Sequence, residues 1–363
     1  MSMNRRTALT ATAALAATAL SAQSARAGSA KAAASAARRV LFEDDFSGGF
    51  ATSGPAARWT HIPFGGGVGQ DAVATTSRRG LRLAAKGANP RTGEPAFTLT
   101  LGQHETSGLP GTLDHIKWLS YPDRRTSEGT LGFSAEPGRL LVGESWMTAT
   151  AYGTAAHPFG SAVADALDDP RLAMAGLPVE DQETGIAVDF FFTNRSVYAF
   201  YERLPNHRDT LGNYAAFTYA VPVARRSSPT AEHHIAIEYD RSRGIIRWRL
   251  DGREVFKVDR IGHLLPSRRY LLLDHGGTPA SVTPRQLTFG LGMFDALDFA
   301  RPGVAGSGLV RLTTEEGHYF DPVRGEPAPQ SFLDDAARPE NRLWGQGAAL
   351  GVRRFLVSSR NSG

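Results

Sequence analysis

Hydrophobic and polar residues alternate along several short stretches of the chain, as they do in strands with one buried face. The clearest of these stretches, His233 to Ile261, predicts two consecutive β-hairpins. Asp251-Gly252 predicts a type I′ turn for the second hairpin, because both central residues of that turn need a positive φ. The turn sets three cross-strand pairs, the last of them an ion pair: Leu250 with Arg253, Trp248 with Val255, and Arg249 with Glu254.

A second strong hairpin signal covers Gly185 to Leu204, with a two-residue turn predicted at Asn194-Arg195. Its strands are almost continuously apolar and aromatic, which indicates a central pair covered on both sides or a face that lines an aromatic cleft. The predicted register places two acids among aromatic residues on one face, whereas a slip of one residue would separate the acids. The residues that share this face are Asp189, Tyr198, Phe200 and Glu202.

Further strands are predicted in segments bounded by turn-forming residues. They cover residues 40–46, 81–84, 96–101, 139–142, 144–149, 214–223, 270–273, 287–291 and 354–357. The apolar spacing between Phe159 and Leu177 instead predicts short helical turns, which we interpret as a loop insertion near residues 155–183. The whole pattern predicts an all-β antiparallel sandwich or jelly roll over residues 40–299, with a C-terminal extension over residues 300–363 packed on it.

The first 27 residues predict an export signal that takes no part in the fold. Arg5-Arg6 precedes a mild apolar run, and Ala25-Arg26-Ala27 offers a cleavage site. The paired arginines indicate the bacterial twin-arginine route, with a general secretory signal as the alternative. The run is too short and too weakly apolar to span a bilayer, and residues 28–39 read as a flexible leader. We therefore expect an exported, extracellular bacterial protein without stable membrane insertion.

The composition excludes several classes of function. The 363 residues include no cysteine, so there is no disulfide, thiolate metal site or cysteine nucleophile. The formal charge of +4 falls to near +1 once Arg5, Arg6 and Arg26 are removed with the signal. No block of basic residues with interleaved aromatics is present, so we expect no nucleic-acid partner.

Four segments carry a resemblance to a known family. They are Phe42-Glu-Asp-Asp-Phe-Ser-Gly48 with the later Trp59, Trp248-Arg-Leu-Asp-Gly-Arg-Glu-Val255, Leu271-Leu-Leu-Asp-His-Gly-Gly277, and Leu287 to Phe294. Over about residues 40–299 the chain resembles the concanavalin A-like lectin/glucanase superfamily. The resemblance implies two curved antiparallel sheets whose concave face holds a sugar chain or another extended ligand.

In hydrolases of that superfamily the resemblance implies catalysis by two carboxyl groups. The Glu-x-Asp-x-Glu motif of family-16-like members is absent from this sequence. The nearest match, Glu238-Tyr-Asp240, lacks the third acid and runs into a turn. The usual hydrolase assignment therefore does not transfer.

The candidate catalytic residues are Glu202 and Asp189 of the hairpin predicted over Gly185 to Leu204, with Glu183 as a weaker alternative. An acid inside so apolar a stretch is expected to have a raised pKa, which suits a general acid. The alternative is structural: Glu202 pairs with Arg203 or another arginine, and Asp189 bonds to backbone. Five aromatic residues are candidates for substrate binding by stacking, with core packing as the alternative for each: Tyr198, Tyr201, Trp118, Tyr121 and Trp146.

We expect no cofactor, because no phosphate loop, dinucleotide fingerprint or histidine metal motif occurs. A structural calcium ion held by Glu43, Asp44 or Asp45 is the one metal that the sequence leaves open. The leading hypothesis is a secreted protein that binds or modifies carbohydrate, with an acid/base carboxyl group if it is an enzyme. Two alternatives stay open: an exported cyclase or isomerase with a closed apolar pocket, and a non-catalytic envelope interaction protein.

Overall fold

The computed structural model describes residues 38–62, 71–85, 96–97, 115–314, 318–319 and 329–362. The predicted export signal, residues 1–27, lies outside these ranges. The predicted leader, residues 28–39, also lies outside them, except for Arg38 and Arg39, which begin a strand. Within the described ranges, no helix is both long enough and apolar enough to cross a membrane.

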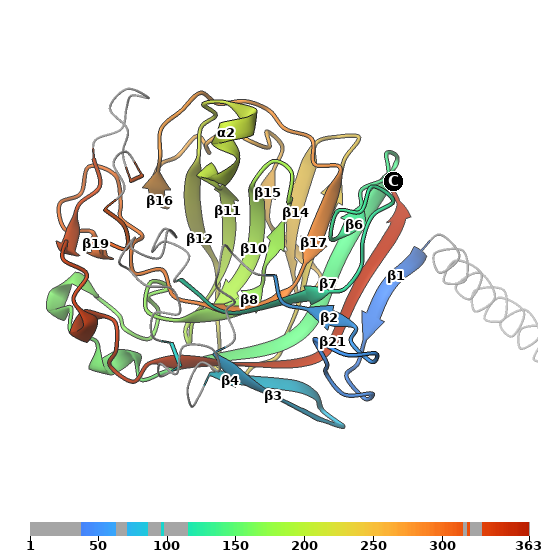
Figure 1. The fold of residues 1–363 in the computed structure, drawn as a ribbon, viewed down its shortest axis with the longest axis horizontal. Helices are drawn as coiled ribbons and strands as arrows, with labels where there is room; N and C mark the ends of the chain where they lie inside the picture. Colours follow the sequence, from blue (N-terminus) through green and yellow to red (C-terminus); the bar gives the residue numbers. More distant parts are fainter. Residues whose placement is uncertain are drawn as a thin grey trace, which may run out of the picture.

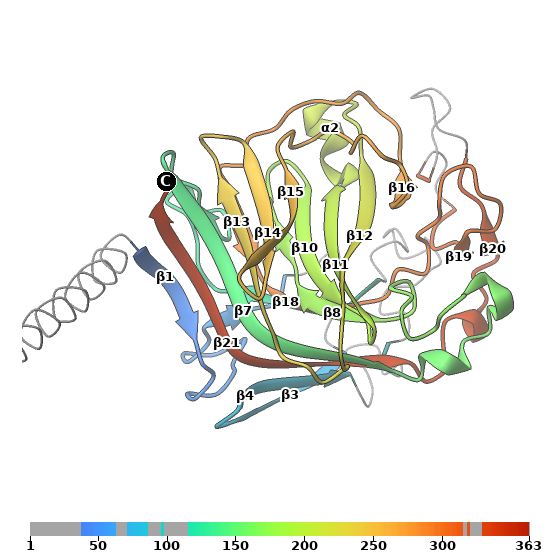
Figure 2. The same ribbon diagram turned by 180° about the vertical axis from the view of Figure 1, so that it is seen from behind.

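Two antiparallel β-sheets form the body of the molecule (Figure 1). Eight of the described strands make the first sheet. Its order is β15 (Arg253–Val258), β14 (Ile245–Leu250), β13 (His233–Asp240), β7 (Arg139–Tyr152), β21 (Gly347–Asn361), β4 (Gly80–Ala85) and β3 (Ala72–Ser77), with β1 (Arg38–Asp44) also paired to β21. The two long strands β7 and β21 lie side by side and curve strongly through the sheet (Figure 2).

Eleven of the described strands make the second sheet. Its main order is β16 (Leu271–Asp274), β12 (Phe217–Arg225), β11 (Ser196–Arg203), β10 (Ile186–Phe192), β8 (Met174–Leu177), β18 (Leu291–Phe294), β5 (Ile116–Pro122) and β2 (Trp59–Thr60). Three short strands join it at the side: β9 (Val179–Glu180), β17 (Gln286–Phe289) and β6 (Phe133–Ser134).

The remaining described elements are short. They are a parallel pair, β19 (Gly308–Val310) with β20 (Phe332–Asp334), the helix α2 (Arg208–Leu211), and the 3-10 turns η3 (Thr154–Ala156), η4 (Gly160–Ala162), η5 (Pro205–His207) and η6 (Pro339–Asn341). The predicted all-β antiparallel sandwich with little helix is therefore confirmed.

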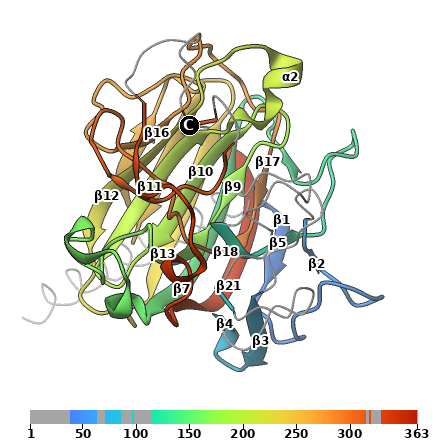
Figure 3. The same ribbon diagram turned by 60° about the vertical axis from the view of Figure 1, so that its left-hand side comes forward.

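Successive side chains along the strands of the second sheet point to opposite faces, so its apolar residues form two separate clusters. Phe190 and Trp118 face the first sheet and pack in one core with its Trp248. Phe191 and Phe200 face the other way and belong to a second cluster, together with residues that follow β18. We call this second side the outer face. The orange and red segment that follows β18 lies across part of it (Figure 3).

All three predicted hairpins form, and one of them contains a register shift. Thr193 bonds to Ser196 across the predicted two-residue turn, and Asp189 pairs with Phe200 as expected. Asp251 and Gly252 both have positive φ, as a type I′ turn requires.

The predicted pairing of Trp248 with Val255 is wrong. A β-bulge after the turn shifts the register, so that Trp248 pairs with Phe256. Arg249 and Glu254 are opposite each other, but their predicted ion pair is also wrong. Arg249 instead binds Glu238 of β13 (2.8 Å), and Glu254 binds Arg247 (3.3 Å).

Two predicted boundaries also need correction. The last residues are not an extension, because β21 pairs with β7, β4 and β1 inside the first sheet. Within residues 300–345, the part that the structure describes contacts the second sheet through residues such as Phe332. The loop insertion is shorter than predicted, because β8 and β9 belong to the second sheet.

Candidate functional site

Three carboxyl groups lie together on the outer face of the second sheet. Ala187 of β10 pairs with Glu180 of β9 on one side and with Glu202 of β11 on the other. Residues paired in this way point to the same side of a sheet, and so does Asp189, which lies two residues beyond Ala187. We call Glu180, Asp189 and Glu202 the carboxyl cluster.

Each member of the carboxyl cluster accepts a hydrogen bond from a different neighbour. The donors are the Val179 amide to Asp189 Oδ1 (2.7 Å), Thr218 Oγ1 to Glu202 Oε2 (2.6 Å) and Gln182 Nε2 to Glu180 Oε2 (2.9 Å). Asp189 and Glu202 also bond to each other, which requires a proton between the two carboxyl groups. Asp189 and Glu202 are buried, whereas Glu180 is partly exposed.

The environment raises the pKa of all three acids. Burial raises the pKa of Glu202 to about 7. Burial, followed by the charges of Asp181 and Glu202, raises the pKa of Glu180 to about 7, against the effect of a hydrogen bond with Tyr121. Burial and the charge of Glu202 hold the pKa of Asp189 well above its usual range. Both shifts favour a proton held between Asp189 and Glu202.

The sequence left open a structural role for the two acids, with Asp189 bonded to backbone and Glu202 paired with an arginine. The structure shows the first of these contacts but not a pair between Glu202 and Arg203. Asp189 does bond to backbone, at Val179. Glu202 does not pair with Arg203, because successive strand residues point to opposite faces. The Arg203 guanidinium lies over the Tyr214 ring at 3.9 Å and donates to the Ala280 carbonyl (2.8 Å).

Glu202 makes the stability of the protein depend on pH. Its pKa is about 7 in the folded protein and near 4.5 in the unfolded chain, so the folded state binds more protons between these values. Its contribution to the free energy of unfolding is fully present below pH 4.5 and falls as pH rises to about 7. Glu202→Gln removes that charge. We therefore expect the free energy of unfolding at pH 8 to be larger in the variant than in the wild type by on the order of 3 kcal/mol.

Urea denaturation at pH 5 and pH 8 measures this difference. The fall in the free energy of unfolding from pH 5 to pH 8 should be smaller in the Glu202→Gln variant than in the wild type. An equal fall in both proteins would show that Glu202 titrates normally.

A groove of about 580 Å³ opens on another part of the outer face. Tyr198, Ala220, Leu272 and Phe299 contribute to its floor, and residues 162–171 and 301–307 form its walls. Phe200 lies between the groove and the carboxyl cluster. It pairs with Asp189 and packs against Phe299, with ring centres 6.2 Å apart. The groove and the carboxyl cluster are therefore separate sites on one face.

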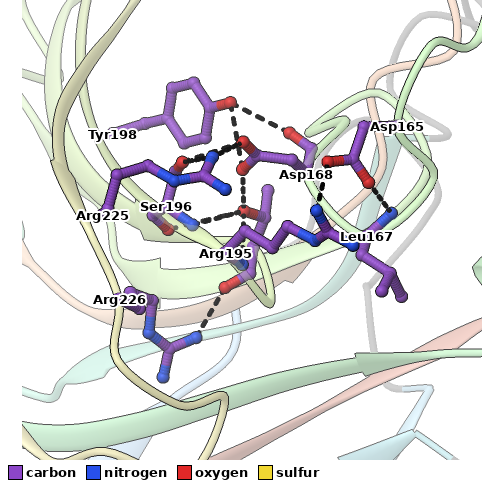
Figure 4. Close-up of polar contacts among 9 residues, drawn as sticks. Asp165, Leu167, Asp168, Arg195, Ser196, Tyr198, Arg225 and Arg226 are labelled. Atoms are coloured by element: carbon purple, nitrogen blue, oxygen red, sulfur yellow. Dashed lines mark hydrogen bonds and ion pairs between the residues drawn. The ribbon is translucent and has the colours of Figure 1, made fainter.

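Asp168 connects one wall of the groove to the turn between β10 and β11 (Figure 4). Its carboxylate accepts hydrogen bonds from Thr193 Oγ1 (2.7 Å) and Ser196 Oγ (2.9 Å) and forms an ion pair with Arg225. The Tyr198 hydroxyl donates to the Asp168 carbonyl (2.9 Å). These contacts hold the Tyr198 ring in place in the floor.

Tyr201 and Trp118 do not reach the outer face. Both are buried in the core between the sheets, because they occupy the inward positions of β11 and β5. The Tyr201 hydroxyl donates to the His263 carbonyl (2.9 Å), and Trp118 packs against Phe50. For these two residues, core packing replaces the predicted stacking on a ligand.

Trp146 and Glu183 also lie away from the carboxyl cluster. Trp146 is on the far side of the first sheet, stacked on His234 at 4.1 Å between ring centres. Glu183 is in the loop after β9 and pairs with Arg285 (2.5 Å). Of the predicted site residues, the outer face brings together Asp189, Glu202, Tyr121 and Tyr198.

Glu180 is the member of the carboxyl cluster that the sequence analysis missed. The signal was present, because Val179 and Glu180 form an apolar and polar pair next to Leu177. Pro178 interrupts the stretch, however, and a proline in a run of strand residues argues against a central strand. The structure resolves this conflict by ending β8 at Leu177 and starting β9 at Val179.

The acids considered for calcium bind protein groups. Asp44 accepts a hydrogen bond from Trp59 Nε1 (2.9 Å) and pairs with Arg58 (3.2 Å), and Glu43 pairs with Arg354 (2.7 Å). Within the ranges that the structure covers, no group of three or more histidine or acidic residues is placed to hold a metal ion.

Two curved antiparallel sheets define an all-β sandwich of the jelly-roll type, and the carboxyl cluster lies on the outer face of its second sheet. By sequence, the chain belongs to the family of unknown function DUF6081, whose model matches residues 43–361. An uncharacterized protein of Acanthamoeba polyphaga mimivirus is 32% identical over 280 residues, which cover 53% of this chain and 64% of the viral protein. The chain thus spans less than two thirds of that relative.

Three solved structures illustrate the similarity in fold. An endo-beta-1,3-glucanase from Pyrococcus furiosus is 12% identical with a TM-score of 0.41, covering 90% of this chain and 96% of the glucanase. An endo-1,3-beta-glucanase from Streptomyces sioyaensis is 12% identical with a TM-score of 0.37, covering 90% and 98%. An alginate lyase from Corynebacterium sp. is 9% identical with a TM-score of 0.33, covering 79% and 80%.

Proposed function

We propose that this protein is exported, and that it binds carbohydrate on the outer face of the second sheet and cleaves it by acid/base chemistry at the carboxyl cluster. Glu180 is the group that meets the substrate, because it is the partly exposed member of the cluster. Asp189 and Glu202 lie behind it and share a proton. The observation that carries the proposal is the placement of three carboxyl groups side by side on one face of the sheet, through the pairing of Ala187 with Glu180 and with Glu202. This environment raises the pKa of Glu180 and of Glu202 to about 7.

A carboxyl group with this pKa suits proton transfer at neutral pH. Half of the Glu180 groups are protonated near pH 7, so the same side chain can give a proton and take one back. In hydrolysis of a glycosidic bond, the protonated Glu180 gives its proton to the leaving oxygen. A water molecule then adds to the anomeric carbon and loses a proton to a carboxylate. The hydrogen bonds from Gln182 and Tyr121 orient the Glu180 carboxyl group.

Two features favour this proposal over the alternatives left open by the sequence. The cavity on the outer face is an open groove with a tyrosine in its floor, whereas a cyclase or isomerase pocket is expected to be closed. Among the residues that the structure describes, neither Glu180 nor Glu202 forms an ion pair with an arginine, whereas a purely structural role predicts salt-bridged acids.

A screen of neutral and acidic polysaccharides tests the proposal. The purified protein is incubated with each polysaccharide, and new reducing ends are measured along with binding on a glycan array. We expect one class of polysaccharide to be bound and cleaved. Absence of both binding and cleavage across the panel would overturn the proposed function.

A further inference from the structure

The groove on the outer face is held open by the protein alone. Arg171 lies between its walls and donates to the Ala162 carbonyl (2.9 Å) on one side and to the Ser307 carbonyl (2.6 Å) on the other. Asp169 holds the same guanidinium through several short contacts. A site whose walls are already fixed loses little conformational entropy when a ligand binds.

The acids around the groove are already neutralised. Asp165 pairs with Arg195 (3.2 Å), Asp168 with Arg225, and Asp169 with Arg171 (2.5 Å). These three ion pairs use all the aspartates that line the groove. These aspartates therefore do not give the groove a net negative charge that would attract cations.

Two arginines at the groove have no carboxylate partner among the residues that the structure describes. Arg301 lines the groove, is exposed, and has no hydrogen bond or ion pair from its guanidinium to any described residue. Arg269 lies over the ring of Tyr270, another lining residue, at 5.1 Å. The uncompensated charge at the groove is therefore positive, and a guanidinium fits a carboxylate with two parallel hydrogen bonds.

The floor adds a preference for a ring with an apolar face. Tyr198, Tyr270 and Phe299 present aromatic surface to the groove, and such surface stacks on the C–H face of a sugar. We propose that the groove binds a carboxylated sugar, a uronic acid residue, whose ring lies on this aromatic floor and whose carboxylate pairs with Arg301. This binding site is distinct from the carboxyl cluster and does not depend on turnover there.

Titration calorimetry with an oligogalacturonate tests the inference, with a maltooligosaccharide of equal length as the neutral comparison. We expect the wild type to bind the uronate and to bind the neutral sugar at least tenfold more weakly. Arg301→Gln should raise the dissociation constant for the uronate at least tenfold. Arg253→Gln, which changes an exposed arginine on β15 of the first sheet, is the matched control and should leave it unchanged.

A second variant fills the groove without touching its hydrogen bonds. Ala305 lines the groove and is exposed, so Ala305→Trp should abolish uronate binding in a protein that unfolds at the wild-type temperature. Equal affinity for both sugars, unchanged uronate binding in Arg301→Gln, or no uronate binding to the wild type would each overturn the inference. Glu180→Gln should keep uronate binding, so a failure of the proposed catalysis is seen separately.

Discussion

Replacing Glu180 by glutamine is expected, under the proposed acid/base mechanism, to lower the rate of polysaccharide cleavage by a factor of about 10² to 10⁴, the usual contribution of a general acid or base. Glutamine has nearly the same shape and keeps an oxygen for the bond from Gln182, but it cannot transfer a proton. The rate of the wild type should fall as pH rises above about 7, because burial sets the pKa of Glu180 there. Rate against pH, measured for both proteins, should show that the variant lacks this fall.

Glu183→Gln is the matched control for this experiment. Glu183 is close in sequence and also an acid, but it pairs with Arg285 in the loop after β9. Its removal should leave turnover and the pH profile unchanged. If both variants turn over substrate at the wild-type rate, Glu180 has no part in proton transfer.

Arg226→Ala is expected to lower the free energy of unfolding by about 4 kcal/mol. Arg226 is buried, and its guanidinium donates to the carbonyls of Thr193 (2.5 Å), Ala149 (2.8 Å) and Pro229 (2.8 Å). These contacts join the β10–β11 hairpin of the second sheet to β7 of the first sheet. The truncation leaves three carbonyls without this donor, and each buried polar group without a partner costs about 1–3 kcal/mol.

The neighbouring residue provides the comparison for Arg226. Arg225 is exposed and pairs with Asp168, so Arg225→Ala should cost no more than about 1 kcal/mol. Urea denaturation of the two variants and the wild type measures the contrast. Similar losses in both variants would mean that the contacts of Arg226 between the sheets add little to stability.

The sequence predicted the fold where local signals and the sheet agree. The turn at Asn194-Arg195 and the alternation on either side fix the pairing of Asp189 with Phe200, because a slip would turn every apolar residue outward. The same reasoning fails next to Asp251-Gly252. A bulge after the turn adds one residue to a strand and shifts the register. No residue type near Trp248 predicts this bulge.

The candidate site was only half predictable for a related reason. Asp189 and Glu202 are on one hairpin, so local register brings them together. Glu180 joins them through a strand of two residues that follows a proline, and its pairing with Ala187 depends on the whole sheet. Trp146 and Tyr201 were misplaced because periodicity shows that a residue alternates, but not which of two buried faces it occupies.

The position of β21 bears on how the protein acquires its structure. This strand contributes to the middle of the first sheet, yet its partner β1 lies about three hundred residues earlier in the chain; Arg38 Nε donates to Ser358 Oγ (3.1 Å) across 320 positions. Such distant pairing slows folding. While β21 is still being synthesised, the 14 residues of β7 lack one of their two neighbours. A nascent chain is therefore open to aggregation at this edge, and a chaperone that covers β7 is expected to raise the yield of folded protein.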